Sequence, residues 1–149
     1  MGQAGVVEVR LLNPGDEDVT VEAARLFGAG GDLDPVAFLC REETALIIAE
    51  DEGGVAGWVY GHELVHPDGE RTMLLYALHV AGRARRRGVG TALVNAFVDH
   101  ARGAGCTEVW VLSDDANPGG IATYEAAGGV REATPQVLFT WKLAEGRHS

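Results

Sequence analysis

One segment in the middle of the chain restricts the possible folds more than any other. Residues 72–80 contain the run MLLYALHV, which is apolar on both faces, and the polar, basic stretch GRARRRGVG follows it. Residues 91–105 then place apolar side chains at helical spacing, at Leu93, Val94, Phe97, Val98 and Ala101. The sequence therefore predicts a strand at the centre of a sheet, a cationic glycine loop and an amphipathic helix, in that order.

The flanking segments predict a single α/β (α+β) domain over residues 1–149. Strands are expected at 6–12, 45–50, 55–64 and 108–112, with a final pair at 130–133 and 137–143. Helices are expected from about 16 to 27, from 35 to 42 with Asp34 as N-cap, and from 117 to 127. We expect a mixed, mostly antiparallel central sheet of six to seven strands with helices on both faces.

The charge of the chain argues against a general nucleic-acid partner. Its 12 Lys and Arg against 22 Asp and Glu give a formal net charge of −10, whereas phosphate backbones are held by positive surfaces. Five of the 12 basic residues nevertheless lie between Arg83 and Arg102, which indicates one local anion site. No stretch approaches the roughly 20 apolar residues of a membrane span, and the first residues lack a signal-peptide pattern, so we expect a cytoplasmic protein without a membrane partner.

The two cysteines, Cys40 and Cys106, are too few for a disulfide scaffold. Neither has His or Cys at metal-ligand spacing, and neither has a neighbouring signature of an activated nucleophile. We expect reduced, buried thiols and no metal.

The loop Arg85–Gly90 has three features that suit a pyrophosphate. Glycines let the backbone approach a ligand, the start of the following helix carries partial positive charge, and the arginines add full charges. The loop lacks the Gly-Lys-Ser/Thr of a P-loop and the Gly-x-Gly-x-x-Gly of a dinucleotide fingerprint. The alternative is a solvated basic turn whose glycines only end the strand.

Two motifs carry a family resemblance that spans most of the chain. The pattern Leu78-x-Val80-x-Gly82-x-x-Arg85-x-x-Gly88-x-Gly90 resembles the acyl-CoA-binding motif of the GNAT N-acetyltransferase superfamily, which usually has Pro in place of Gly82. The spacing of Asn117, Tyr124 and Gly128 is similar to a second block of that superfamily. Segments at 25–28, 45–49 and 55–57 look like class I aminoglycoside 3-N-acetyltransferases, although Ala77 stands where that class has Asp and the loop 113–117 differs in length.

The resemblance implies direct transfer of acetyl from acetyl-CoA to an amine without a covalent enzyme intermediate. It also implies that Tyr124 donates a proton to the departing CoA sulfur. The coenzyme-binding residues that it implies are Leu78, His79, Val80, Arg85, Arg86, Arg87, Gly88, Val89, Gly90, Thr91, Asn117 and Tyr124.

The acceptor amine must lose a proton before it attacks, since aliphatic amines are mostly charged at neutral pH. Asp114 and Asp115 are the first candidates to accept that proton, followed by Glu63 and Tyr76, with His79 as a further alternative; any of the acids could instead be solvated or cap a helix. The predicted substrate-binding residues are Asp32, Asp34, Glu63, Tyr76, Asp114 and Asp115.

The resemblance implies the 3-amino group of an aminoglycoside antibiotic as the acceptor. The acidic chain is consistent with that acceptor, because negative charge attracts polycations. The alternatives are another small amine, a polyamine or a peptide amine, and, from a different class, a non-catalytic acyl-CoA-binding or sensing domain. Relatives often pair through C-terminal strands, which implies a homodimer.

Overall fold

The computed structural model of the chain describes residues 7–26, 28–133 and 135–143. Five strands form one sheet in the order β1-β2-β3-β4-β5, antiparallel except for the parallel pair β4–β5. The strands are β1 (Glu8–Leu11), β2 (Thr44–Asp51), β3 (Gly54–Val65), β4 (Arg71–Val80) and β5 (Glu108–Trp110). The helices are α1 (Glu17–Leu26), α2 (Pro35–Leu39), the 3₁₀ turn η1 (Gly82–Ala84), α3 (Val89–Gly103) and α4 (Pro118–Ala126). The predicted mixed, mostly antiparallel sheet is confirmed.

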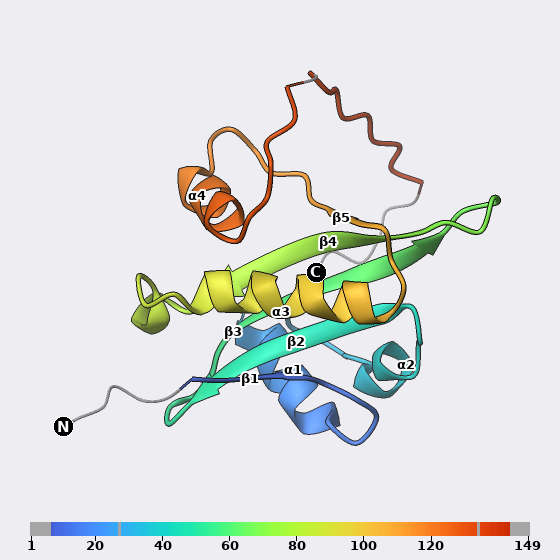
Figure 1. The fold of residues 1–149 in the computed structure, drawn as a ribbon. Helices are drawn as coiled ribbons and strands as arrows, with labels where there is room; N and C mark the ends of the chain where they lie inside the picture. The colour runs from blue at the N-terminus through green and yellow to red at the C-terminus, as the bar shows by residue number, and fades with distance from the viewer. Residues whose placement is uncertain (1–6, 27, 134, 144–149) are drawn as a thin grey trace.

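The prediction of six to seven strands is wrong for the described residues, because the expected C-terminal pair does not form. Residues 130–133 and 135–143 have no strand structure, and apolar side chains such as Leu138 and Trp141 are exposed. β5 contributes only three residues, so its outer edge has too few backbone groups to hold a seven-residue strand. Figure 1 shows the segment after α4 leaving the sheet as an extended coil.

The second helix begins as predicted and ends early. Asp34 caps α2, since its Oδ1 accepts a 3.1 Å hydrogen bond from the amide of Ala37. The helix stops at Leu39 rather than Glu42, because the Thr44 hydroxyl donates to the carbonyls of Phe38 and Arg41 at 3.1 and 2.9 Å and draws the chain into β2.

Helices cover both faces of the sheet, as the sequence predicts (Figure 1). On one face α3 buries Leu93 and Phe97 against a cluster that includes Val59 of β3. On the other face Trp58 of β3 lies in a second cluster with α1, and its indole N–H donates to the carbonyl of Ala23 at 2.9 Å. The period-two alternation of β3 thus separates two layers of core.

A β-bulge interrupts the pairing of β3 with β4. Tyr60 pairs with Ala77 and Gly61 pairs with Leu75, so Tyr76 is an extra residue in β4. A Cβ atom at position 61 would overlap the Leu74 carbonyl oxygen and lie 2.6 Å from the Phe97 ring. Glycine at this position therefore allows the bulge and α3 to pack against β3 together.

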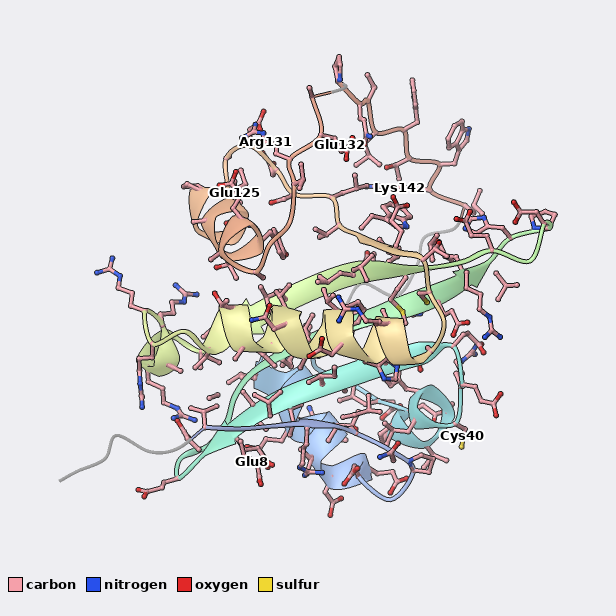
Figure 2. All side chains as sticks on the ribbon, in the orientation of Figure 1. Glu8, Cys40, Glu125, Arg131, Glu132 and Lys142 are labelled. Carbon is pink, nitrogen blue, oxygen red and sulfur yellow. The ribbon has the colours of Figure 1, made fainter. Side chains whose placement is uncertain are left out.

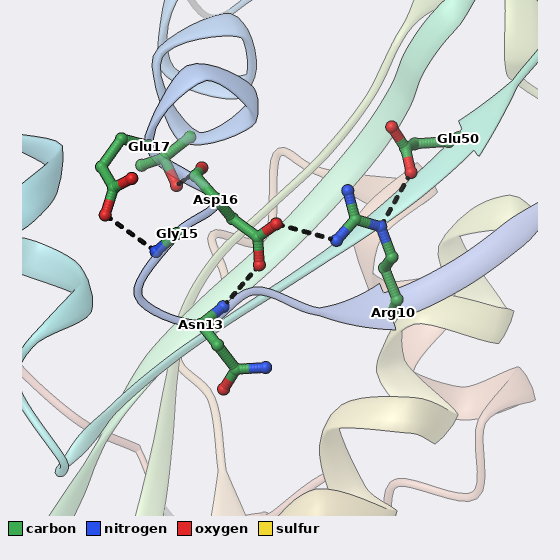
Figure 3. A network of polar contacts seen from close by, with 7 residues as sticks. Arg10, Asn13, Gly15, Asp16, Glu17 and Glu50 are labelled. Atoms are coloured by element: carbon green, nitrogen blue, oxygen red, sulfur yellow. Dashed lines mark hydrogen bonds and ion pairs between the residues drawn. The ribbon is translucent and has the colours of Figure 1, made fainter.

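A polar network ties the edge of the sheet to the start of α1 (Figure 3). The Arg10 guanidinium on β1 binds Glu50 of β2 at 2.9 Å and Asp16 at 3.2 Å. Asp16 also accepts the amide of Asn13 at 2.8 Å. The Asn13 amide and the Arg10 guanidinium hold the pKa of Asp16 below its usual range, so the carboxylate stays charged and fixes the turn between β1 and α1.

We expect Gly61→Ala to lower the free energy of unfolding by about 2–3 kcal/mol, because the added methyl group must displace the β4 backbone or Phe97. The matched control is Gly103→Ala at the end of α3, where no atom lies within 4 Å of the new Cβ. It should leave stability unchanged or raise it by up to about 1 kcal/mol. Urea unfolding measures both, and equal stability of the two variants would contradict the close approach.

Candidate functional site

The loop between β4 and α3 is held to the sheet by one of its four arginines. Arg83 binds Asp51 at 2.6 Å and donates to the carbonyl of Val55 at 3.2 Å. The hydrogen bond from Arg83 lowers the pKa of Asp51 below its usual range. Arg83 therefore anchors the loop to the β2–β3 turn, whereas Arg85, Arg86 and Arg87 are exposed to solvent.

The backbone of this loop turns through two left-handed residues before α3 begins. Gly88, the N-cap of α3, has φ 78°, and Arg86 has φ 64°, a conformation uncommon outside glycine. The first N–H groups of a helix have no acceptor within the helix and point away from its N-terminus. The side chains of Arg85, Arg86 and Arg87 are exposed around this point, so the loop combines free amides with concentrated positive charge.

The start of α4 lies against the start of α3. A Cβ atom on Gly90 would lie 3.2 Å from the Thr123 methyl group, so glycine allows the two helices to approach. Asn117 caps α4 by accepting the Gly120 amide at 3.1 Å. Tyr124 is half-buried against the apolar cluster that Leu78 and Val80 also contact, and burial raises the pKa of its phenol. The structure thus brings the end of β4, the cationic loop and α4 together.

The outer edge of β4 is open beside this loop. β5 pairs with Thr72–Leu74 and, among the described residues, with no later part of β4. Main-chain groups alternate between the two sides of a strand, and the His79 carbonyl lies against Gly57 of β3. The main-chain groups of Leu78 and Val80 therefore face the gap between the two parallel strands. Val80 also accepts a 3.3 Å hydrogen bond from the Arg85 side chain, which places the first loop arginine at the end of the open edge.

The acids predicted for substrate contact do not form one group. Asp115 pairs at 2.8 Å with Arg131, which follows α4 and is labelled in Figure 2. Asp114 accepts the amide of Ala116 at 2.8 Å. Asp34 caps α2. Asp32 is exposed in the loop before α2.

Glu63 and Tyr76 lie on opposite faces of the sheet. Glu63 pairs with Arg71 at 3.0 Å and is opposite Met73, at the end of the strands remote from the loop. Tyr76, the bulge residue of β4, is 62% exposed, and its ring centroid lies 5.5 Å from that of Tyr60. Of the six predicted substrate residues, Tyr76 therefore lies at the bulge and Glu63 far from the loop.

Sequence reasoning missed a cluster of rings on the face opposite α3. Tyr60 is its centre, since its ring centroid lies 5.5–6.0 Å from four other rings. We call these residues the Tyr60 cluster: Phe38, Trp58, Tyr60, His62 and Tyr76. The alternation of Trp58, Tyr60 and His62 along β3 was the available signal, because residues two apart share one face of a strand.

His79 is the titratable group nearest the loop on β4. Burial, and to a smaller extent the charge of Arg85, lower the pKa of its imidazole. Its ring centroid lies 6.1 Å from that of Trp58, on the face of the Tyr60 cluster. The ring is therefore neutral at neutral pH and can accept a proton on that face.

The cysteines lie away from the loop. Cys40 is exposed at the C-terminal cap of α2 (Figure 2). The prediction that both thiols are buried is therefore wrong for this residue, because α2 ends at Leu39 and does not carry Cys40 on a packed helical face. Cys106 is partly buried, which raises the pKa of its thiol. In the part of the chain that the structure describes, no three His, Cys, Asp or Glu side chains gather into a metal site, and no helix is both long and apolar enough to cross a bilayer.

Comparison with known proteins gives one family. The profile of the Acetyltransferase (GNAT) family matches residues 18–129. An L-2,4-diaminobutyric acid acetyltransferase of Nocardia farcinica is 32% identical over 113 residues; the match covers 74% of this chain but only 58% of that relative.

Solved structures of low identity have the same fold. An aminoglycoside acetyltransferase from an uncultured soil sample, in complex with sisomicin, superposes with TM-score 0.81 at 18% identity, covering 91% of this chain and 97% of the other. The aminoglycoside N-acetyltransferase AAC(6′)-Iy, in complex with CoA, superposes with TM-score 0.77 at 20% identity, covering 97% and 99%.

The environment of His79 predicts a titration that can be measured directly. NMR titration of the imidazole should give a midpoint below the ordinary value of about 6.5. Arg85→Gln should move the midpoint upward without restoring the ordinary value, since burial is the larger cause and remains. Because the folded-state pKa is lowered, stability should fall as the pH drops through the range between about 6.5 and that midpoint. A midpoint at or above 6.5 in the unmodified protein would contradict this environment.

Proposed function

The chain belongs to the GNAT acetyltransferase family, and we propose on this basis that it transfers the acetyl group of acetyl-CoA to an amine. The observation that carries the proposal is the meeting of three parts at one place. The open edge of β4, the cationic loop before α3 and the half-buried phenol of Tyr124 all lie beside the same apolar cluster. This combination supports acetyl transfer over a solvated basic turn or a sensing domain that needs no acid.

The coenzyme fits the loop by charge and by shape. Its diphosphate would be held by the amides of Gly88–Thr91 and by the exposed guanidinium groups of Arg85, Arg86 and Arg87. Its pantetheine arm would follow the open edge of Leu78, His79 and Val80 toward the bulge at Tyr76, which lies about 13 Å along the strand from Val80. Asn117, at the start of α4, flanks this path.

The transfer needs two protons to move. The amine nitrogen attacks the thioester carbon, the carbon–sulfur bond breaks, and the thiolate takes a proton from the phenol of Tyr124. Burial raises the pKa of that phenol, so the proton is present throughout the neutral range. For the proton that the amine loses we propose His79, directly or through a water. The ring is neutral, lies on the face of the Tyr60 cluster and is three residues along β4 from the bulge at Tyr76.

The sequence predicts a more specific acceptor, the 3-amino group of an aminoglycoside. It is supported by the resemblance of residues 25–28, 45–49 and 55–57 and by the shared fold of aminoglycoside acetyltransferases. The separate placement of the acids gives it no further support. Thiol release from acetyl-CoA with gentamicin, spermidine, 2,4-diaminobutyrate and a peptide amine tests it, and release with none of several amines would overturn acetyl transfer itself.

We expect Arg86→Glu to raise the dissociation constant for CoA about tenfold, because it replaces a guanidinium near the diphosphate with a negative charge. Arg102→Glu is the matched control, since it makes the same charge change at the exposed end of α3, next to Asp99. Isothermal titration calorimetry with CoA at one salt concentration compares the two variants. Equal affinities would show that the loop does not hold the diphosphate through this residue.

Removal of the Tyr124 hydroxyl should slow turnover, while the dissociation constant for CoA stays within about twofold of that of the unmodified protein. We expect Tyr124→Phe to lower kcat about 100-fold or more, as for loss of a general acid. The unmodified protein should also lose activity at a pH above the ordinary phenol pKa of about 10, because the raised pKa delays ionisation. That alkaline decline should be absent in Tyr124→Phe, and an unchanged kcat would rule out the acid role.

A further inference from the structure

A pocket of about 360 Å³ lies between α1, the segment before α2, α2 itself and the sheet. Its volume falls in the range of about 300–1,000 Å³ that is usual for small-molecule sites. The walls are almost wholly apolar and include Ala24, Leu33, Phe38, Leu46, Trp58 and Tyr60. It is on the face opposite α3, and so on the opposite side of the sheet from the packing of Tyr124.

The Tyr60 cluster connects this pocket to the bulge of β4. The rings of Phe38, Trp58 and Tyr60 line the pocket, and the centroid of Tyr60 lies 5.5 Å from that of the bulge residue Tyr76. Tyr60 also pairs through its backbone with Ala77, directly beside the bulge. A molecule whose body occupies the pocket therefore has one end next to the part of β4 that the thioester would reach.

Three of the four polar side chains in the lining already make hydrogen bonds, and the fourth is the phenol of Tyr60. Asp34 is its one acidic residue, and its Oδ1 accepts the Ala37 amide. The Trp58 indole N–H donates to Ala23, and the Thr20 hydroxyl donates to the carbonyl of Asp16 at 2.9 Å. A sugar with several ammonium and hydroxyl groups would lose its hydration here and find fewer partners than it has polar groups, and burial of unpaired polar groups is costly.

One ammonium group at the mouth of the pocket is a different case. Tyr60 lines the pocket and its ring centroid lies 5.5 Å from that of Tyr76, and aromatic faces attract a cation while they also contact apolar surface. The carboxylate of Asp34 adds negative charge at the wall. The site thus fits a molecule with one positive end and an apolar body.

Resting on the proposed function, we propose that the acceptor is a monoamine with an apolar, ring-bearing body, of the arylalkylamine class. The ring occupies the pocket between Ala24, Phe38 and Trp58, and the amine lies beside Tyr60 and Tyr76, facing the bulge of β4. The nitrogen attacks the thioester carbon from this face, the thiolate leaves on the other side of β4 with a proton, and the amine proton leaves on the ring face. Phe38 and Tyr60 are then specificity-determining residues.

The test compares amines that differ in the body and share the primary amino group. Thiol release from acetyl-CoA is measured with phenethylamine, ethylamine and gentamicin, and the affinity of phenethylamine is measured by calorimetry without acetyl-CoA. We expect kcat/KM for phenethylamine to exceed that for ethylamine and for gentamicin at least about tenfold.

Two alanine-to-leucine substitutions, one inside the pocket and one outside it, separate an effect of filling the pocket from a general effect of added side-chain volume. Ala24→Leu narrows the pocket from α1 and should lower kcat/KM for phenethylamine about tenfold while leaving ethylamine unaffected. Ala37→Leu adds the same side chain at an exposed position of α2 outside the lining and should change neither value. If Ala24→Leu proves unstable in urea, Ala24→Val makes a smaller version of the same change.

The outcomes distinguish this inference from the function on which it rests. Two results would overturn the assignment of the pocket and leave acetyl transfer standing: equal kcat/KM for all three amines, or the same kcat/KM for phenethylamine in Ala24→Leu and in the unmodified protein. Binding of phenethylamine with no thiol release from any amine would overturn acetyl transfer, and the acceptor assignment with it.

Discussion

The close approach of β3, β4 and α3 is the constraint on which the rest of the structure depends. Gly57 and Gly61 have no side chains, so the Leu93 and Phe97 side chains of α3 lie directly against β3. This packing fixes the axis of α3 across the sheet, and with it the position of the α3 N-terminus at the end of β4. The bulge at Tyr76 forms opposite Gly61, so one backbone contact sets both the cationic loop and the face where an acceptor would arrive.

The two sides of β4 have different chemistry, and the proposed reaction uses that difference. On the α3 side lie the exposed arginines, free helix amides and Tyr124, which suit an anionic coenzyme and a leaving thiolate. On the opposite side lie His79, the Tyr60 cluster and an apolar pocket, which suit an uncharged nucleophile with an apolar body. The acids predicted to bind substrate do not gather at one place in the described residues, since Glu63 pairs with Arg71 near one end of β3 and Asp115 pairs with Arg131 after α4.

Local rules predicted the elements near the site well. The predicted cap Asp34 is confirmed, because capping depends on residues three apart in the chain. The C-terminal strands were wrong, because a strand needs a neighbour and β5 is only three residues long. Cys40 was expected to be buried, and the early end of α2 exposes it. The Tyr60 cluster was missed because it joins α2, β3 and β4, which no single segment displays.

The sequence by itself determined the strand, glycine loop and helix at residues 72–105, because hydrophobic periodicity, glycine spacing and clustered arginines act over a few residues. It also carried the family resemblance through the spacing of Gly88, Gly90, Asn117 and Tyr124. Only the tertiary structure decided which acids form ion pairs and which arginine anchors the loop to the β2–β3 turn, namely Arg83. It also decided that Phe38 from α2 and Trp58 and Tyr60 from β3 line one pocket. Those outcomes depend on contacts between residues far apart in the chain, whose distances are set by how the helices pack on the sheet.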